Sequence, residues 1–257
     1  MCVPTDITYI KIPYKGIETT VLLIRTPEGD VLFDAASYEE DITDYVLPWL
    51  TAQGIGYDRI KYVFISHKHD DHAGGLPALL RALPHLRVVT QSAVLQEKYG
   101  AERVWLAQDG EMLCGCLRTV SVPGHTADSA ALLDTRTGTL ICGDCLQLHG
   151  IFGMGKWGAN IPFPAAHRQA VARLREMPIE TVMTAHDYYP MRDICHGREE
   201  IAAALDACIA PLDRIEALIA AHPTWDDEAV CALYNEAPMT PTLGAHVVRA
   251  VRRDMKR

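Results

Sequence analysis

The residues best suited to chemistry lie in one short segment, His67-Lys68-His69-Asp70-Asp71-His72. Imidazole and carboxylate groups bind zinc, iron and manganese in proteins. His67 and His69 are two residues apart, so in an extended segment their side chains point to the same side, whereas Asp71 and His72 follow the bend and can reach a second point. The spacing therefore predicts two adjacent metal ions. A solvated polar turn, the competing interpretation, would better suit a single histidine than three within six residues.

Three further candidate ligands, His125, Asp144 and His186, stand at the ends of later strand-like runs. Each follows an apolar stretch and precedes a turn, and binding residues are usually found on loops at strand ends. We expect these side chains to project from one edge of a stack of sheets. Together with the cluster they make seven candidate ligands for two metal ions.

The elements that must position these residues alternate between strands and helices. Apolar and β-branched runs predict strands at residues 7–12, 19–25, 31–33, 62–65, 87–90, 117–122, 130–133, 139–142 and 181–183. Apolar residues at helical spacing predict helices at residues 38–52, 164–177, 198–221, 226–235 and 243–255. The pattern implies two halves that each combine strands and helices. The strand at 62–65 runs directly into the histidine cluster.

Length and composition set the frame for this organisation. At 257 residues the chain is long enough for one large domain or a domain with an appendage. Its 49% hydrophobic and 22% charged residues are typical of globular proteins and argue against disordered and fibrous classes. Because no strand signal remains after residue 197, we predict a catalytic domain over residues 1–195 and a helical extension over residues 196–257.

Charge and cysteine usage bear on partners and compartment. The formal net charge of −9 argues against broad affinity for nucleic acid or anionic membrane. The N-terminus lacks a basic start followed by an apolar run, and no stretch approaches the roughly 20 apolar residues that span a bilayer. The eight cysteines are scattered without the density of a disulfide scaffold. We therefore expect a cytoplasmic protein that acts on a small molecule and has no membrane segment.

The order and spacing of these elements, over residues 7–190, resemble the metallo-β-lactamase superfamily, whose hallmark is an HxHxDH cluster followed by a His, an Asp and a His on later loops. The resemblance implies an αββα sandwich, two β-sheets face to face with helices outside, here followed by the helical extension. It also implies the ligand sets: His67, His69 and His125 for one metal ion, Asp71, His72 and His186 for the other, and Asp144 bridging both.

The resemblance carries implications for the chemistry as well. Asp34, at the end of an early hairpin, matches an acidic position of the family that supports the ligand histidines without binding metal; a strand-end cap is the alternative. The implied reaction is hydrolysis, in which a metal-bridged hydroxide attacks a carbonyl and Asp71 or Asp144 carries the proton. Zinc is the expected metal, with iron and manganese as alternatives because the ligand types suit all three.

Several functions are compatible with the same ligands. Pro123-Gly124-His125-Thr126 resembles glyoxalase II-type thioesterases and acyl-homoserine lactone lactonases, which implies an ester, thioester or lactone substrate. A phosphodiesterase or nuclease is the first alternative, and the net charge of −9 disfavours it. A mononuclear iron dioxygenase of the persulfide type, using His67, His69 and Asp144, is the second. A scaffold that has lost activity is disfavoured because every ligand position is filled.

Residues outside the ligand set give weaker signals. The Gly-rich segment 150–158 is either a lid over the substrate or a plain surface loop. The apolar stripe within residues 198–221 predicts a core or dimer contact, and hence a homodimer. Other histidines are expected at the surface or as caps, with His149 a candidate to line the pocket. The tyrosines after the last ligand are expected to pack or to donate a hydrogen bond to substrate: Tyr188 and Tyr189.

Overall fold

The computed structural model describes residues 6–146, 159–188, 192–236 and 243–256. It divides into two compact units. Unit 1 comprises Met1–Ser121 and Asp128–Gly143, and unit 2 comprises Val122–Ala127 and Asp144–Arg257. The lid or loop predicted at 150–158, with His149 and Tyr189, lies outside the described residues.

The first sheet of unit 1 has six strands in chain order. The strands are β1 (Ile7–Tyr14), β2 (Ile17–Ile24), β3 (Asp30–Phe33), β4 (Ile60–Ile65), β5 (Arg87–Thr90) and β6 (Val104–Leu106). β1, β2 and β3 pair antiparallel through tight turns, whereas β3 to β6 pair in parallel and need longer connections. The carboxyl ends of β3 and β4 are therefore neighbours, with Phe33 opposite Phe64.

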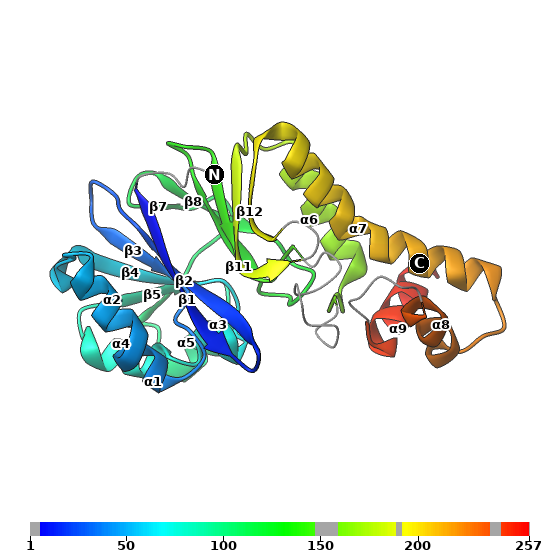
Figure 1. Ribbon diagram of the computed structural model, residues 1–257, viewed down its shortest axis with the longest axis horizontal. Helices are drawn as coiled ribbons and strands as arrows, with labels where there is room; N and C mark the ends of the chain where they lie inside the picture. Colours follow the sequence, from blue (N-terminus) through cyan, green and yellow to red (C-terminus); the bar gives the residue numbers. More distant parts are fainter. Residues whose placement is uncertain (1–5, 147–158, 189–191, 237–242, 257) are drawn as a thin grey trace. The chain divides into compact units, whose positions relative to one another are not determined.

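Helices cover one face of this sheet (Figure 1). They are α1 (Glu39–Asp41), a π-helical segment (Ile42–Val46), α2 (Leu47–Ala52), α4 (Leu76–Ala82) and α5 (Ala93–Tyr99), with the short α3 (Asp70–Ala73) before α4. Alternate strand residues such as Leu32 and Val63 join Val46 and Leu79 in one core cluster. Their neighbours in the strands, Phe33 and Phe64, point to the opposite face, where the rings stack at 5.5 Å. Both faces are buried, which explains the continuous apolar runs of these strands.

The second sheet in unit 1 is an antiparallel meander, β7 (Met112–Leu113), β8 (Leu117–Ser121), β9 (Ala130–Asp134) and β10 (Thr139–Cys142). The turn between β7 and β8 places Cys114 and Gly115 at φ 47° and 65°, the left-handed geometry of a tight hairpin. The two sheets, with helices outside, confirm the predicted α/β class. β6, β7 and α5 were not predicted, because three-residue and two-residue strands carry too little periodicity and Ala93–Tyr99 has a weak apolar stripe.

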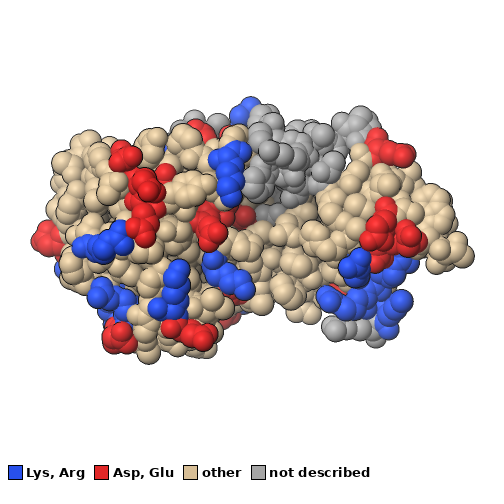
Figure 2. Space-filling view, turned by 90° about the horizontal axis from the view of Figure 1, so that it is seen from below, with Lys and Arg blue, Asp and Glu red and all other residues tan. Residues whose placement is uncertain are grey.

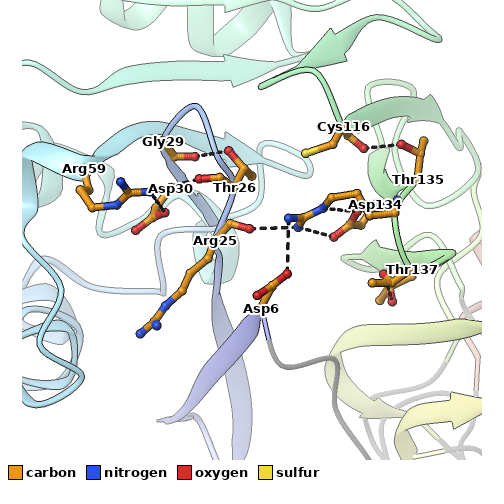
Figure 3. A network of polar contacts seen from close by, with 12 residues as sticks. Asp6, Arg25, Thr26, Gly29, Asp30, Arg59, Cys116, Asp134, Thr135 and Thr137 are labelled. Atoms are coloured by element: carbon orange, nitrogen blue, oxygen red, sulfur yellow. Dashed lines mark hydrogen bonds and ion pairs between the residues drawn. The ribbon is translucent and has the colours of Figure 1, made fainter.

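The two sheets of unit 1 are tied together at both ends. At the carboxyl end of β4, the Ala130 N–H donates to the Ser66 carbonyl at 2.8 Å. At the other end, the Arg136 guanidinium donates to both oxygens of Asp134, at 2.9 and 2.7 Å, and to the Arg25 carbonyl at 2.9 Å. Figure 3 shows the two acceptors, Asp134 and Arg25. The Asp134 side chain is fully buried whereas that of Arg136 is 27% exposed, so the carboxylate has the guanidinium in place of water.

The described residues of unit 2 form a strand pair and four helices. The elements are α6 (Pro164–Arg175), β11 (Thr181–Tyr188), β12 (Arg192–His196), α7 (Gly197–Ala221), α8 (Asp227–Asn235) and α9 (Ala245–Asp254). β11 and β12 pair antiparallel with an irregularity between Met183 and Tyr188. β12 was not predicted, and β11 extends beyond the expected strand. The predicted boundary near residue 196 falls at the start of α7, but as a division into domains it stays a prediction.

The apolar stripe of α7 belongs to the core of unit 2. Leu212, Ile215 and Ile219 pack with residues of α8 and α9, including Val230 and Val248. The stripe therefore gives the predicted homodimer no support, and the homodimer stays a prediction. Within the described ranges, no helix is both long and apolar enough to cross a membrane.

We expect Arg136→Met to destabilise the protein by about 2 kcal/mol, because it leaves the buried Asp134 carboxylate with only a backbone N–H donor. Urea unfolding followed by circular dichroism measures this loss. Arg81→Met, which removes an exposed ion pair with Glu39, is the matched control and should leave the unfolding midpoint nearly unchanged. Equal unfolding midpoints for the two variants would show that the Arg136 contacts with Asp134 and Arg25 do not stabilise the protein.

Candidate metal centre

Asp34 organises the candidate ligands of unit 1. It follows β3, is fully buried, and adopts a left-handed backbone with φ 62°, a conformation that Asp tolerates better than most residues. Its Oδ1 accepts the Ser66 backbone N–H at 2.8 Å. Its Oδ2 is 3.0 Å from the Ser66 hydroxyl and 2.7 Å from Nδ1 of His72. The carboxylate is thus bound by donors from the segment that follows β4.

These contacts assign the tautomers of two histidines. A carboxylate only accepts hydrogen bonds, so Nδ1 of His72 carries the proton that faces Asp34. The Ser66 hydroxyl has one proton and donates it to Asp34, so its oxygen accepts from Nδ1 of His67 at 3.1 Å. Both rings therefore present an unprotonated Nε2, the form in which histidine binds a metal ion.

The cluster residues of unit 1 lie in two pairs. Nε2 of His67 is 3.0 Å from Nδ1 of His69, and Nε2 of His72 is 3.7 Å from Oδ2 of Asp71. The rings of His67 and His72 are 4.2 Å apart, so the pairs are neighbours. His67 therefore faces His69, and His72 faces Asp71; that each pair binds its own metal ion stays a prediction.

Backbone contacts fix the bend that follows His72. The Ala35 N–H donates to the His72 carbonyl at 2.8 Å. A Cβ on Gly74 would lie 1.8 Å from the Ser37 carbonyl oxygen, so only glycine fits at this point. The Gly-Gly pair that follows the histidines in the sequence therefore lets the bend approach the segment after Asp34.

Unit 2 contributes a second group of candidate ligands around Asp144. Nδ1 of His125 donates to the Asn160 carbonyl at 3.0 Å, which leaves the lone pair of its Nε2 facing Oδ2 of Asp144 at 3.4 Å. Nε2 of His186 lies 3.4 Å from Oδ1 of the same carboxylate. A lone pair that faces a carboxylate oxygen repels it unless a cation or a proton lies between them. These residues therefore fit a metal ion.

A buried histidine packs behind the His125 loop. Burial lowers the pKa of His167 to about 4, so its ring is neutral at pH 7, and Nε2–H donates to the Cys208 carbonyl at 3.3 Å. A Cβ on Gly124 would lie 2.6 Å from Nδ1 of His167, so the ring requires glycine before His125. The expectation that His167 lies at the surface or acts as a cap is wrong, because its ring fills the space between α6 and α7.

Several supporting residues were not predicted as part of the site. Tyr188 is fully buried, and its hydroxyl donates to Oδ1 of Asp144 at 2.7 Å. It therefore positions Asp144, which goes beyond the expected alternatives of packing or binding substrate. Ser66 stands directly before the histidine cluster, and its position between β4 and His67 is the only sequence signal for its role. Asn160 acts through its backbone carbonyl, for which a side-chain pattern gives no signal.

A sequence profile described as the metallo-beta-lactamase superfamily matches residues 15–186. The chain belongs to this superfamily. The match contains the histidine cluster, His125, Asp144 and His186, and it begins before Asp34. The superfamily that the HxHxDH pattern indicated is thereby confirmed.

Individual relatives are similar over part of their length. The chain is 33% identical over 130 residues to the uncharacterized protein YobT of Bacillus subtilis, covering 41% of this chain and 55% of that protein. It is 34% identical over 129 residues to a hydroxyacylglutathione hydrolase of Gloeobacter violaceus, covering 49% of each chain. The chain spans about half the length of these curated relatives.

The fold is similar to that of a metallo-beta-lactamase family protein from Thermus thermophilus. The TM-score is 0.66 at 20% identity, over 97% of this chain and 94% of that chain. This likeness concerns the fold alone.

We expect Asp34→Asn to lower zinc affinity roughly 10- to 100-fold, because an amide cannot accept all three hydrogen bonds that fix Ser66 and His72. Asn also tolerates the left-handed backbone, so the fold should persist. Competition with a chromophoric chelator measures the affinity. Asp30→Asn, at the opposite end of β3, removes a buried carboxylate paired with Arg59 and is the control. Zinc bound as tightly by Asp34→Asn as by Asp30→Asn would refute the role of Asp34.

Proposed function

We propose that this protein is a binuclear metal-dependent hydrolase that cleaves an ester, thioester or lactone of a small molecule. The observation that carries the proposal is the set of hydrogen bonds at Nδ1 of His67, His72 and His125, which assign the proton to Nδ1 and make each Nε2 suitable as a metal ligand. Membership of the metallo-β-lactamase superfamily supports the same reaction class.

The proposed ligands divide between two metal ions as the family pattern implies. His67, His69 and His125 would hold one ion, Asp71, His72 and His186 would hold the other, and Asp144 would be a ligand shared by both. The donor set of five histidines and two aspartates consists of nitrogen and oxygen ligands. Such a set suits zinc, our proposed metal, and also iron and manganese.

When bound, the two ions supply an activated water and polarise the substrate carbonyl. The protein's own residues orient these components. Tyr188 holds Asp144 through Oδ1, so the carboxylate keeps one orientation. Asp71, whose side chain is 16% exposed, is more accessible than Asp144 and is our proposed carrier of the proton to the leaving group. Thr19 donates to the Asp71 carbonyl at 2.9 Å and fixes its backbone.

The proposed substrate class is supported by the name of one relative and by the distribution of charged side chains on the surface. The Gloeobacter violaceus relative is named a hydroxyacylglutathione hydrolase, which supports a thioester. A nuclease needs a basic surface, and in Figure 2 most Lys and Arg side chains lie next to Asp and Glu, apart from one group of basic side chains at the lower right. In α9, Arg249 and Arg252 both pair with Asp227. These pairs reduce the charge available to a polyanion.

We also propose a cytoplasmic location, which stays an expectation from the sequence. The seven cysteines that the structure describes are free thiols. Free thiols suit a reducing compartment.

The test is metal content and hydrolysis by the protein and its His69→Ala variant. We expect about two zinc ions per chain and turnover of a thioester, an ester or a lactone that chelation abolishes. His69→Ala should lower kcat/KM at least about 100-fold, since it removes a metal ligand. His85→Ala, which replaces an exposed histidine of unit 1, is the matched control and should retain activity.

Other outcomes would identify the alternatives. One iron per chain, with oxygen uptake and no hydrolysis, would replace the hydrolase with a persulfide-type dioxygenase. Turnover of a phosphodiester alone would indicate a phosphodiesterase.

A further inference from the structure

The hairpin between β1 and β2 ends beside the histidine cluster. Tyr14 pairs with Ile17, and the two-residue turn between them has Lys15 at φ 45° and Gly16 at φ 86°. This left-handed pair is the tight hairpin turn that keeps the strands in register up to the tip. Further along β2, Thr19 donates to the Asp71 carbonyl, so the hairpin is fastened to a proposed ligand.

The tip of this hairpin carries a solvent-exposed cation. The Lys15 ammonium lies 4.8 Å from the centroid of the Tyr14 ring, within the range of a cation–π contact. A hydrogen bond with the Tyr14 side chain raises the pKa of the exposed Lys15 ammonium. Lys15 is therefore charged at pH 7.

An exposed aromatic ring stands beside this cation. The rings of Tyr14 and Tyr38 are 5.7 Å apart, and Tyr38 is 45% exposed although it is a large apolar side chain. Its loop is ordered by Asp41, whose carboxylate accepts the Ser37 and Tyr38 backbone N–H groups at 3.1 and 2.9 Å. Tyr38 follows Asp34 by four residues, so the loop leads from the centre of the site to the exposed ring.

Lys15 and the Tyr38 ring together suit a substrate that carries an anionic group on an apolar chain. The chain carries a net charge of −9, so its surface away from the proposed metal ions on average repels an anion. A lysine held at this position offsets that repulsion locally. An apolar ring next to it offers contact for the methylene groups that would join an anionic group to the scissile bond.

We propose that Lys15 binds a carboxylate of the substrate while Tyr38 packs against the chain that carries it, so that the protein prefers carboxylate-bearing thioesters and esters to neutral ones. The proposal rests on the hydrolase function proposed above. Lys15 acts as a specificity-determining residue: it contacts a part of the substrate remote from the carbonyl and changes binding more than turnover.

The test uses two pairs of thioesters that differ by one carboxylate. One pair is the adipoyl and hexanoyl thioesters of N-acetylcysteamine, and the other is the hexanoyl thioesters of N-acetylcysteine and N-acetylcysteamine. We expect the charged member of at least one pair to have a kcat/KM about threefold to tenfold higher, through KM. The preference should fall as ionic strength rises, because salt screens an exposed charge.

Lys15→Met should abolish this preference and leave hydrolysis of the neutral thioesters unchanged, and Lys15→Glu should reverse it. Lys61→Met is the matched control, because Lys61 is exposed at the amino end of β4, donates to the Asp58 carbonyl, and should not affect the preference. The same charged-to-neutral ratio in wild type, Lys15→Met and Lys61→Met would overturn the proposal.

A binding measurement separates this proposal from the hydrolase function. Calorimetry with the amide analogues of the same pairs reports carboxylate recognition even if no thioester is cleaved. Tighter binding of the charged amide to wild type than to Lys15→Met, without turnover, would support the role of Lys15 and refute the proposed reaction. Turnover of neutral thioesters, with equal binding of the charged amide by wild type and Lys15→Met, would support the proposed reaction and refute the role of Lys15.

Discussion

The site depends on one buried carboxylate, that of Asp34, and on the hydrogen bonds that converge on it. The Asp34 carboxylate accepts a hydrogen bond directly from Nδ1 of His72 and another from the Ser66 hydroxyl, whose oxygen accepts from Nδ1 of His67. These bonds fix the proton on Nδ1 of both rings. The carboxyl ends of β3 and β4 must be adjacent for these bonds to form, and parallel pairing of the two strands places them so. The left-handed backbone of Asp34 is part of the same constraint, because it turns the chain at the end of β3.

In unit 2 the candidate ligands are also oriented by hydrogen bonds, but to other groups. A backbone carbonyl, that of Asn160, fixes the proton on Nδ1 of His125, and Tyr188 orients Asp144. Gly124 lets the neutral ring of His167 pack directly against the loop that carries His125. In both units the candidate ligands are held by buried neighbours, so less reorganisation is needed when they bind a metal ion.

The sequence predicted the parts of this structure that carry periodic or dense signals. Apolar runs predicted β1 to β5 and β8 to β10, and the histidine cluster indicated a metal site because three imidazoles within six residues have few other uses. Local patterns did not predict β6 and β7, which have three and two residues, or β12, whose sequence RDICH contains only two apolar residues. The roles of Ser66, Asn160 and Tyr188 arise from contacts between residues far apart in the chain, such as Tyr188 with Asp144, and only the tertiary fold reveals them.

The central claim, that hydrogen bonding presets the histidine tautomers for metal binding, is tested most directly by nitrogen-15 NMR of the imidazole rings in metal-free protein. Long-range proton–nitrogen correlations identify which ring nitrogen carries the proton. The account predicts the Nδ1–H tautomer for His67, His72 and His125. Protonation of these rings at Nε2, or rapid exchange between the two tautomers, would contradict it.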